Sequence, residues 1–111
     1  MAEVMFPKRR VVPRRKKEGR SCPGHRAWVR RHHCSVPGCE GFPIECAHVR
    51  GCTDGGQSLK PSDNWTLSLC REHHAEQHRI GEVAFERKYG IDMRAIARAF
   101  AQRSPHRHMW L

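Results

Sequence analysis

The chain has 111 residues, of which 38% are hydrophobic and 7% aromatic, and a formal net charge of +10 at pH 7. This length supports one small domain. No apolar run is long enough to cross a membrane, and no apolar segment of a secretory signal follows Met1. We therefore expect a cytoplasmic protein without a membrane partner, whose six cysteines serve as metal ligands before disulfides.

Most of the positive charge lies at the N-terminal end. Residues 1–33 contain eleven Lys/Arg and two acids, a balance of +9, and residues 34–111 contain ten and nine, a balance of +1. Residues 1–21 lack hydrophobic periodicity, and a flexible basic arm is predicted over residues 1–24. Such an arm favours a nucleic-acid partner, and a tail that only aids solubility is the alternative. The arm residues expected to contact nucleic acid are Arg9, Arg10, Arg14, Arg15, Lys16 and Lys17.

The first half of the folded region is expected to hold one strand between two turns. Residues 25–33 fit either a short helix or a strand, and a Pro-Gly pair indicates a turn over residues 34–41. Residues 43–50 read as a strand, and a glycine-containing loop follows over residues 51–63. The two faces of this strand would carry Ile44, Cys46 and His48 on one side and Ala47 and Val49 on the other.

The second half is expected to be one strand followed by helices. Apolar residues alternate over 64–69, which predicts a strand, and residues 71–80 have helical composition. Two further helices are predicted over 83–89 and 93–101, the second capped by Asp92. Their buried stripe would be Phe85, Tyr89, Ile96 and Phe100. The fold class is therefore α+β, with a folded domain over residues 25–103 and a frayed tail over residues 104–111.

Two pairs of metal-ligand residues bracket the predicted hairpin. Cys34 and Cys39 flank a turn, and Cys70 and His73 follow some thirty residues later. Paired ligands on tight turns suit tetrahedral zinc, because each turn aims two side chains at one ion. Four protein ligands leave no position for a substrate, so the predicted zinc site is structural. Buried cysteines beside a surface histidine are the alternative. Zinc would stabilise a core that is small for its chain length.

A second set consists of His48, Asn64, His74 and His78. His74 and His78 are four residues apart and share one helix face, whereas the adjacent His73 and His74 point about 100° apart. One helix can therefore serve two sites, with His73 turned toward the cysteines. Two imidazoles with vacant positions describe an open, catalytic metal site. A solvated helix face is the alternative.

These residues resemble the signature of the HNH nucleases: Ala47-His48, then Asn64, then Cys70-Arg-Glu-His-His-Ala-Glu-Gln-His78. The resemblance covers roughly residues 28–90 and is strongest to short phage- and prophage-borne members, some of them grouped under a domain of unknown function. It implies a ββα-metal core over about residues 44–80, in which one divalent ion lies between a hairpin and a helix. It also implies a bacterial or phage-infected cell as the setting.

The resemblance assigns roles by position. His48 matches the general base that takes a proton from the attacking water, and Asn64 matches the residue that orients this base. His74 and His78 match the helix histidines that hold Mg²⁺ or Mn²⁺, which would bind the scissile phosphate and stabilise the leaving 3′ oxygen. Many relatives have an aspartate where this chain has Ala47, so the third protein ligand is lacking. Asp54 or Asp63 in the loop are the candidates to replace it.

Weaker candidates surround this set. Arg50 and Lys60 flank the loop and are expected to clamp the phosphate, with ordinary surface charge as the alternative. Cys46 and Cys52 are expected to be free thiols, and Cys22 is expected to lie unused in the arm.

The function expected from these features is metal-dependent cleavage of DNA. The first alternative is a zinc-stabilised DNA-binding module without nuclease activity, and the second is a structural or packaging accessory of a phage. A zinc peptidase is disfavoured because no His-Glu-x-x-His motif is present. A double-strand break would require a homodimer or two cleavage events.

Overall fold

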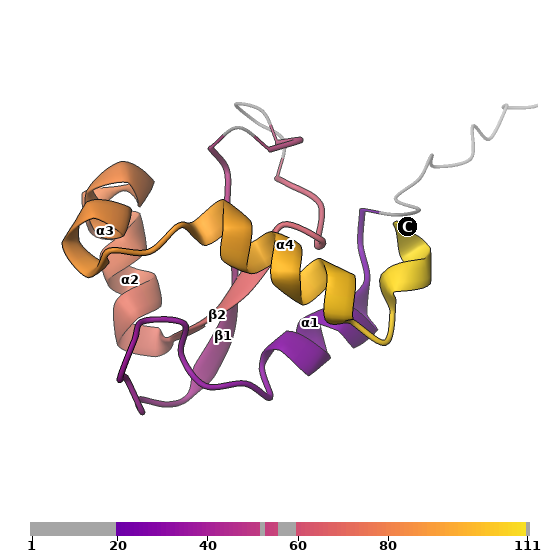
Figure 1. The fold of residues 1–111 in the computed structure, drawn as a ribbon, viewed down its shortest axis with the longest axis horizontal. Helices are drawn as coiled ribbons and strands as arrows, with labels where there is room; N and C mark the ends of the chain where they lie inside the picture. The colour runs from indigo at the N-terminus through magenta and orange to yellow at the C-terminus, as the bar shows by residue number, and fades with distance from the viewer. Residues whose placement is uncertain (1–19, 52, 56–59, 111) are drawn as a thin grey trace, which may run out of the picture.

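A computed structural model of the chain describes residues 20–51, 53–55 and 60–110. The predicted nucleic-acid contacts of the arm (Arg9 to Lys17) and Cys52 lie outside the described residues. Within them, four α-helices and a two-stranded antiparallel sheet form an α+β fold (Figure 1). The elements are α1 (Pro23–Val29), β1 (Ile44–His48), β2 (Thr66–Cys70), α2 (Arg71–Ile80), α3 (Glu82–Tyr89), α4 (Met93–Arg103) and the 3₁₀ helix η1 (Arg107–Met109).

The hairpin of β1 and β2 organises the fold. Ile44 pairs with Cys70 at one end, and His48 pairs with Thr66 at the other. Both strands were predicted, and the structure moves the second by one or two residues. Cys70 ends β2 and is also the N-cap of α2, so the chain enters the helix without an intervening loop. This direct junction fixes α2 relative to the hairpin.

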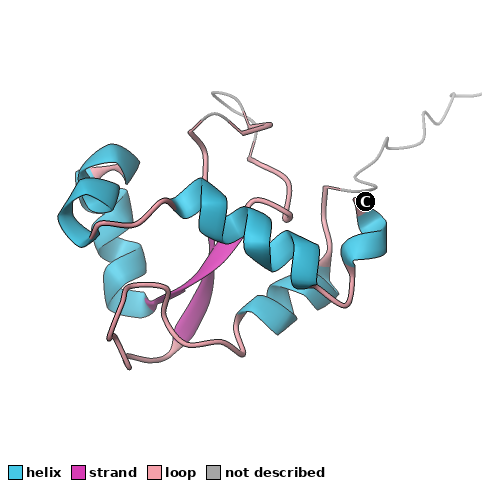
Figure 2. Ribbon diagram, viewed as in Figure 1, coloured by secondary structure: helices cyan, strands magenta, loops and turns pink. Residues whose placement is uncertain are grey.

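The core lies between the hairpin and the C-terminal helices, and α4 crosses in front of β2 in the ribbon view (Figure 2). Of the predicted stripe, only Phe85 is fully buried; the others are partly buried. The residues of α4 that face the core are instead Met93, Ala97 and Ala101, spaced four apart. Small alanine side chains let the helix approach the sheet closely, which the larger aromatic residue at position 100 would prevent. The main buried side chains are Ala47, Val49, Leu67, Leu69, Phe85, Met93 and Ala97.

The helix ends follow from local chemistry. The carboxylate of Asp92 accepts a hydrogen bond from the amide of Ala95 at 3.1 Å, which confirms the predicted N-cap of α4. Gly90 ends α3 at φ 64°, a left-handed conformation that glycine adopts without steric cost.

The N-terminal boundary of the fold differs from the prediction. The sequence permits either a helix or a strand over residues 25–33, and the structure forms α1, which begins at Pro23. Proline suits the first helical turn because its missing N–H has no partner there in any case. Cys22 was expected to lie in the arm, yet it is buried, and its amide donates to the Asp63 carboxylate at 2.7 Å. Residues 20–24 therefore belong to the folded domain.

The C-terminal segment is packed, so the expectation of a frayed tail over residues 104–111 is wrong for the described part. The indole N–H of Trp110 donates to the Ala101 carbonyl at 3.0 Å, and the ring packs edge-on against His25. His25 is fully buried and lies 2.8 Å from the Ser104 hydroxyl. Burial lowers the pKa of His25 to about 4, so this imidazole is neutral at pH 7 and joins α1 to the end of the chain.

Among the described residues, every helix is too short or too polar to cross a lipid bilayer.

Candidate functional site

Four ligand atoms meet where the turn after α1 reaches the junction of β2 and α2. The turn carries Cys34 and Cys39, and it reverses at Gly38, whose φ of 78° favours glycine. Cys70 ends β2, and His73 lies in the first turn of α2. All four ligand atoms lie within 4.8 Å of one another. The predicted set of four is thus brought together, although its two pairs come from segments about thirty residues apart.

The distances within this Cys₃His cluster fit a tetrahedral ion. The Nδ1 atom of His73 lies 3.5 Å from Sγ of Cys34, 3.5 Å from Sγ of Cys39 and 3.4 Å from Sγ of Cys70. Two of the sulfurs are 3.9 Å apart. Zinc with Zn–S bonds of about 2.3 Å and Zn–N bonds of about 2.0–2.1 Å holds sulfur and nitrogen about 3.5 Å apart and two sulfurs about 3.8 Å apart. The cluster can therefore hold a metal ion such as zinc.

The surroundings of the cluster support this role. The amide of Gly41 donates to Sγ of Cys39 at 3.3 Å, and a Cβ at this glycine would lie 3.1 Å from Sγ of Cys70. The ring of His73 packs edge-on against Tyr89, with centroids 5.0 Å apart. Burial raises the pKa of the Cys34 thiol to about 11, so a thiolate here requires a compensating cation. A bound ion would supply that charge.

The second pair of histidines lies on the other side of α2. The Nε2 atoms of His74 and His78 are 3.2 Å apart and face each other, as the shared helix face predicted. Two nitrogens on one ion at about 2.1 Å are separated by about 3.0 Å in octahedral and about 3.4 Å in tetrahedral geometry. The pair therefore has the spacing of two ligands of one ion, and His73 and His74 point in different directions from the helix, as their adjacent positions predicted.

Glu45 supports this pair from β1. Its Oε1 lies 2.8 Å from Nδ1 of His74, which leaves Nε2 of that ring directed toward His78. A carboxylate on the remote nitrogen of a ligating histidine orients the ring and raises its basicity. The sequence reasoning missed Glu45. Its position gave no signal, because Glu45 lies an odd number of residues from His48 and strand alternation places it on the other face.

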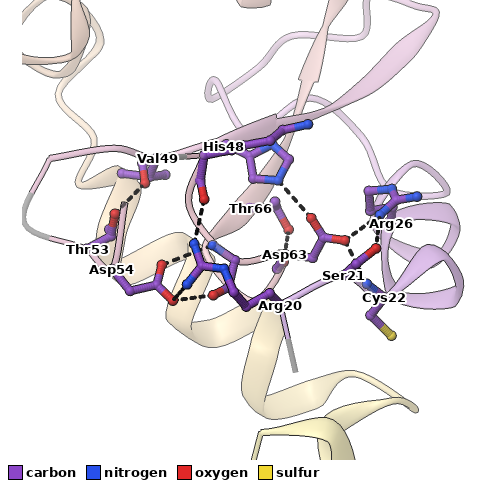
Figure 3. A network of polar contacts seen from close by, with 12 residues as sticks. Arg20, Ser21, Cys22, Arg26, His48, Val49, Thr53, Asp54, Asp63 and Thr66 are labelled. Carbon is purple, nitrogen blue, oxygen red and sulfur yellow. Dashed lines mark hydrogen bonds and ion pairs between the residues drawn. The ribbon is translucent and has the colours of Figure 1, made fainter. Parts of the chain in front are cut away.

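His48 ends β1 and is held by a carboxylate from the loop before β2. Its Nε2 lies 2.8 Å from Oδ1 of Asp63 (Figure 3). Because a carboxylate only accepts, Nε2 carries the hydrogen, and Nδ1 is the nitrogen that can accept a proton. His48 is thus fixed in orientation by a buried partner.

Asp63 is itself held by a dense set of donors. Its Oδ2 accepts from the amide of Cys22 at 2.7 Å and from the guanidinium of Arg26 (Figure 3). Burial alone would raise the pKa of Asp63, but the hydrogen bonds from His48, Cys22 and Arg26 outweigh it and hold this pKa at about 2. The Asp63 carboxylate is therefore ionised at neutral pH.

The orienting contact to His48 was expected from Asn64, and in the structure it comes from the preceding residue, Asp63. Within the described part of the chain, the side chain of Asn64 makes no hydrogen bond. Neither loop carboxylate replaces the ligand lacking at Ala47: Asp63 is bound as described, and Asp54 accepts from the amide of Ser62 at 2.9 Å. That expectation is corrected, because both carboxylates stabilise the loop.

An open cleft of about 490 Å³ connects these groups. Four cationic side chains and one carboxylate line it, so its local charge is positive. The predicted Arg50 and Lys60 are among them, and α1 adds two that were not predicted, Arg26 and Arg30. Cys46 also lines the cleft as a free thiol, with a pKa raised by burial. The lining residues are Arg26, Arg30, Glu45, Cys46, His48, Arg50, Lys60, His74 and His78.

The cleft continues past His48 and His78 into a second hollow of about 430 Å³ that reaches the α2–α3 junction. Glu82 closes this end. Its two carboxylate oxygens accept from the amides of Arg50 at 2.7 Å and Gly51 at 2.9 Å. The start of the loop after β1 is therefore held in place, and Arg50 is kept on the wall of the cleft.

Comparison with known proteins gives a family but no activity. Residues 7–105 match the family described as "Protein of unknown function (DUF968)". The chain is also 40% identical over 72 residues to the uncharacterized protein YdfU of Escherichia coli (strain K12), a match that covers 64% of this chain and 20% of that protein. The match thus spans about a fifth of the relative's length. No solved structure matches the chain.

Proposed function

The chain belongs to the DUF968 family of proteins of unknown function, and from its own site we propose that it is a metal-dependent endonuclease of the HNH type that cuts DNA. The observation that carries the proposal is the cleft itself. It combines an oriented imidazole, His48, with a pair of imidazoles spaced for one ion, His74 and His78. Cations line the same cleft, as a polyanionic substrate requires.

The cationic residues supply binding and charge stabilisation. Arg30, Arg50 and Lys60 lie around the cleft, where they bind the phosphates on either side of the scissile bond. Arg26 is partly neutralised by its ion pair with Asp63. Its main role is to hold the carboxylate that orients the general base, His48. These contacts position the strand, and their strength falls with salt because each neutralised phosphate releases counterions.

His48 acts as the general base. Asp63 accepts the hydrogen of Nε2 and fixes the tautomer, so Nδ1 takes the proton from the attacking water. Histidine is the side chain that most often performs this kind of proton transfer. Asp63 does not take the proton, because its own pKa lies at about 2. The reaction leaves 5′-phosphate and 3′-hydroxyl ends.

Two metal sites with different tasks complete the proposal. The Cys₃His cluster would hold a structural zinc ion and would leave no open position on it. His74 and His78 would hold Mg²⁺ or Mn²⁺, and Glu45 orients the ring of His74. A divalent ion bound there would supply Lewis-acid stabilisation of the charge that develops on the phosphate and the leaving oxygen. These features together make up a ββα-metal core of β1, β2 and α2.

A second candidate is a zinc-stabilised DNA-binding module without catalysis. The observation that favours it is the small ligand set: position 47 is alanine, and the two nearby loop carboxylates are bound elsewhere. With only two protein ligands, metal binding in the absence of DNA is weak. The charge of the cleft would then serve binding alone.

Nicking of supercoiled plasmid DNA separates the two candidates. The wild type with Mg²⁺ or Mn²⁺ is expected to convert it to the open-circular form, and His48→Ala is expected to abolish this at equal zinc content. His108→Ala is the matched control, because His108 is an exposed histidine on η1. If folded, zinc-loaded wild type binds the plasmid but nicks nothing with Mg²⁺, Mn²⁺ or Ni²⁺, the binding module replaces the nuclease. A single cleft cuts one strand per encounter, so linear product would indicate a homodimer or two events.

A further inference from the structure

An aromatic groove lies on α1 away from the proposed catalytic cleft. The groove has a volume of about 340 Å³ and is lined by Trp28, His32, Ile96, Ala99, Phe100 and Arg103. Its residues come from α1 and the turn that follows it, and from α4. This volume lies at the lower end of the range of about 300–1,000 Å³ that is typical of small-molecule pockets. One planar ring system can therefore enter it.

Three rings shape the groove. The ring of Trp28 lies edge-on to that of His32, with centroids 4.6 Å apart, and edge-on to that of Phe100 at 5.7 Å. The rings of His32 and Phe100 are also edge-on, at 4.9 Å. The Nδ1 atom of His32 lies 2.9 Å from the carbonyl oxygen of Trp28, which fixes that ring. All three side chains are only half-buried, so this ordered aromatic wall is open to a ligand.

Helix α1 connects this groove with the cleft. Arg26 and Arg30, four residues apart, line the cleft, and Trp28 and His32, also four apart, line the groove. Within α1, Arg26 and Trp28 are two residues apart, and a helical turn of 100° per residue places them about 200° apart, on opposite sides of the helix. The exposed Ala27 lies between them on the outer face of α1, and the exposed Arg31 lies in the turn that follows the helix.

The path over this outer face suits a single DNA strand. The small side chain of Ala27 leaves room for the DNA strand, and Arg31 offers a partner for one of its phosphates. The arc from cleft to groove is about 19 Å around a helix of about 10–12 Å diameter, a distance of a few nucleotides. A rigid duplex cannot follow that curve within so short a length, because DNA bends smoothly only over about 150 base pairs.

We infer that the groove binds an unpaired base of the DNA strand whose phosphate occupies the cleft, so that the substrate carries a single-stranded segment beside the cleavage site. The inference rests on the proposed function for the identity of the strand. Bases stack on aromatic rings regardless of sequence, since every base offers a π-face. Arg103 at the groove completes the contact with a cation beside the rings.

Binding, measured without added Mg²⁺ or Mn²⁺, tests the inference independently of cleavage. Zinc-loaded protein is titrated into a fluorescein-labelled oligothymidine and into a labelled blunt duplex of the same length, and anisotropy is recorded. Trp28→Leu keeps apolar bulk but removes the stacking ring, and it is expected to weaken single-strand binding by about tenfold. Duplex affinity is expected to stay within about twofold, and Trp28→Phe is expected to restore single-strand binding.

Two further variants guard against a merely structural effect. Ala99→Leu fills the groove and leaves the rings in place, so it is expected to weaken single-strand binding as Trp28→Leu does. Phe42→Leu removes a ring that is 85% exposed and lies outside the groove, and it is expected to change nothing. Unchanged single-strand binding in the folded Trp28→Leu and Ala99→Leu variants would overturn the inference, as would equal losses for both DNA forms.

Other outcomes separate this inference from its alternatives. If Trp28→Leu changes the sedimentation of the protein but not its DNA binding, the groove is an interface between two copies of the chain, and the inference is wrong. Single-strand preference without nicking would leave the groove in place and reject the nuclease. Nicking without single-strand preference would support the nuclease and reject the base-binding role of the groove.

Discussion

The two histidine-containing clusters share one helix but differ in how completely the chain encloses them. At the Cys₃His cluster, four ligand atoms from two segments converge, and two of the four side chains, Cys34 and Cys70, are buried. At the second cluster only His74 and His78 face each other, and the remaining space belongs to an open cleft. Adjacent residues of α2, His73 and His74, thus lead to sites of opposite kind.

The difference teaches how one short helix divides its tasks. A closed set of four ligands can contribute to folding, because the ion replaces contacts that a small core lacks. An open pair contributes little to folding but leaves positions for water and phosphate. The surroundings agree with this division: aromatic rings pack against His73, whereas a carboxylate and four cations lie around the second cluster.

The largest expected effect is on the closed cluster. Cys70→Ser removes one ligand, and zinc binding of about 10–16 kcal/mol is comparable to the whole stability of a small domain. We expect the variant to lose its zinc and most of its helical circular-dichroism signal. Zinc content by mass spectrometry should be one ion per chain in the wild type and near zero in the variant.

Cys46→Ser is the matched control for that experiment. Cys46 is a cysteine of the same hairpin that lies outside the cluster, so its replacement should leave zinc content and the folded signal as in the wild type. A Cys70→Ser protein that keeps one zinc and the wild-type spectrum would show that the cluster is not a structural metal site.

The next largest effect is expected on the nicking rate, through the proposed general base His48. Asp63→Asn keeps the shape of the side chain but removes the charge that fixes His48, so the nicking rate should fall by up to about 10²–10⁴-fold. The apparent KM should change little, because Asp63 acts through His48 and not on the substrate. Since the pKa of Asp63 is about 2, its carboxylate is ionised at every pH above about 4, and the loss should persist across that whole range.

Asn64→Ala sharpens this prediction, because the resemblance to HNH nucleases gives Asn64 the task of orienting the base. In the structure the contact comes from Asp63, so the alanine variant should retain most of the rate. Should Asn64→Ala lose more activity than Asp63→Asn, the orienting role would return to the asparagine.

The smallest effect is expected on the metal affinity of the pair His74 and His78. Glu45→Gln removes the charge that orients His74, and loss of such a contact typically lowers metal affinity by about 10–100-fold. Titration with Mn²⁺ followed by electron paramagnetic resonance should show this loss at unchanged zinc content. Glu72→Gln, an exposed glutamate in the first turn of the same helix, is the control and should bind Mn²⁺ as the wild type does.

Much of the closed cluster could be predicted from the chain because its signal is local. Ligand pairs close in sequence, on a turn and at a strand–helix junction, restrict where each side chain can point. Helix periodicity likewise separates His73 from His74, because adjacent residues of a helix point in different directions. The carboxylates that orient the histidines of the open cleft could not be predicted in this way. Glu45 and Asp63 lie 29 and 15 residues from the histidines that they contact.

The ends of the domain show the same limit. Charge and prolines predict an arm that includes residues 20–24 and a tail over residues 104–111, yet Cys22, His25 and Trp110 pack against distant parts of the fold. The predicted stripe of α4 is misplaced because it gives priority to large apolar residues. The helix instead turns its alanines to β2, where close packing of backbones decides which face is buried.

The sequence by itself determined the hairpin and the helices that follow it, and it marked two sets of candidate ligands. The signals were strand alternation, the cap at Asp92, the paired cysteines and the helical spacing of His74 and His78. These depend on neighbours within a few residues. Only the tertiary structure decided which carboxylate holds His48, which cations of α1 enter the cleft, and where an aromatic groove forms between α1 and α4. Such contacts join segments far apart in the chain, and their geometry is set by how the whole core packs.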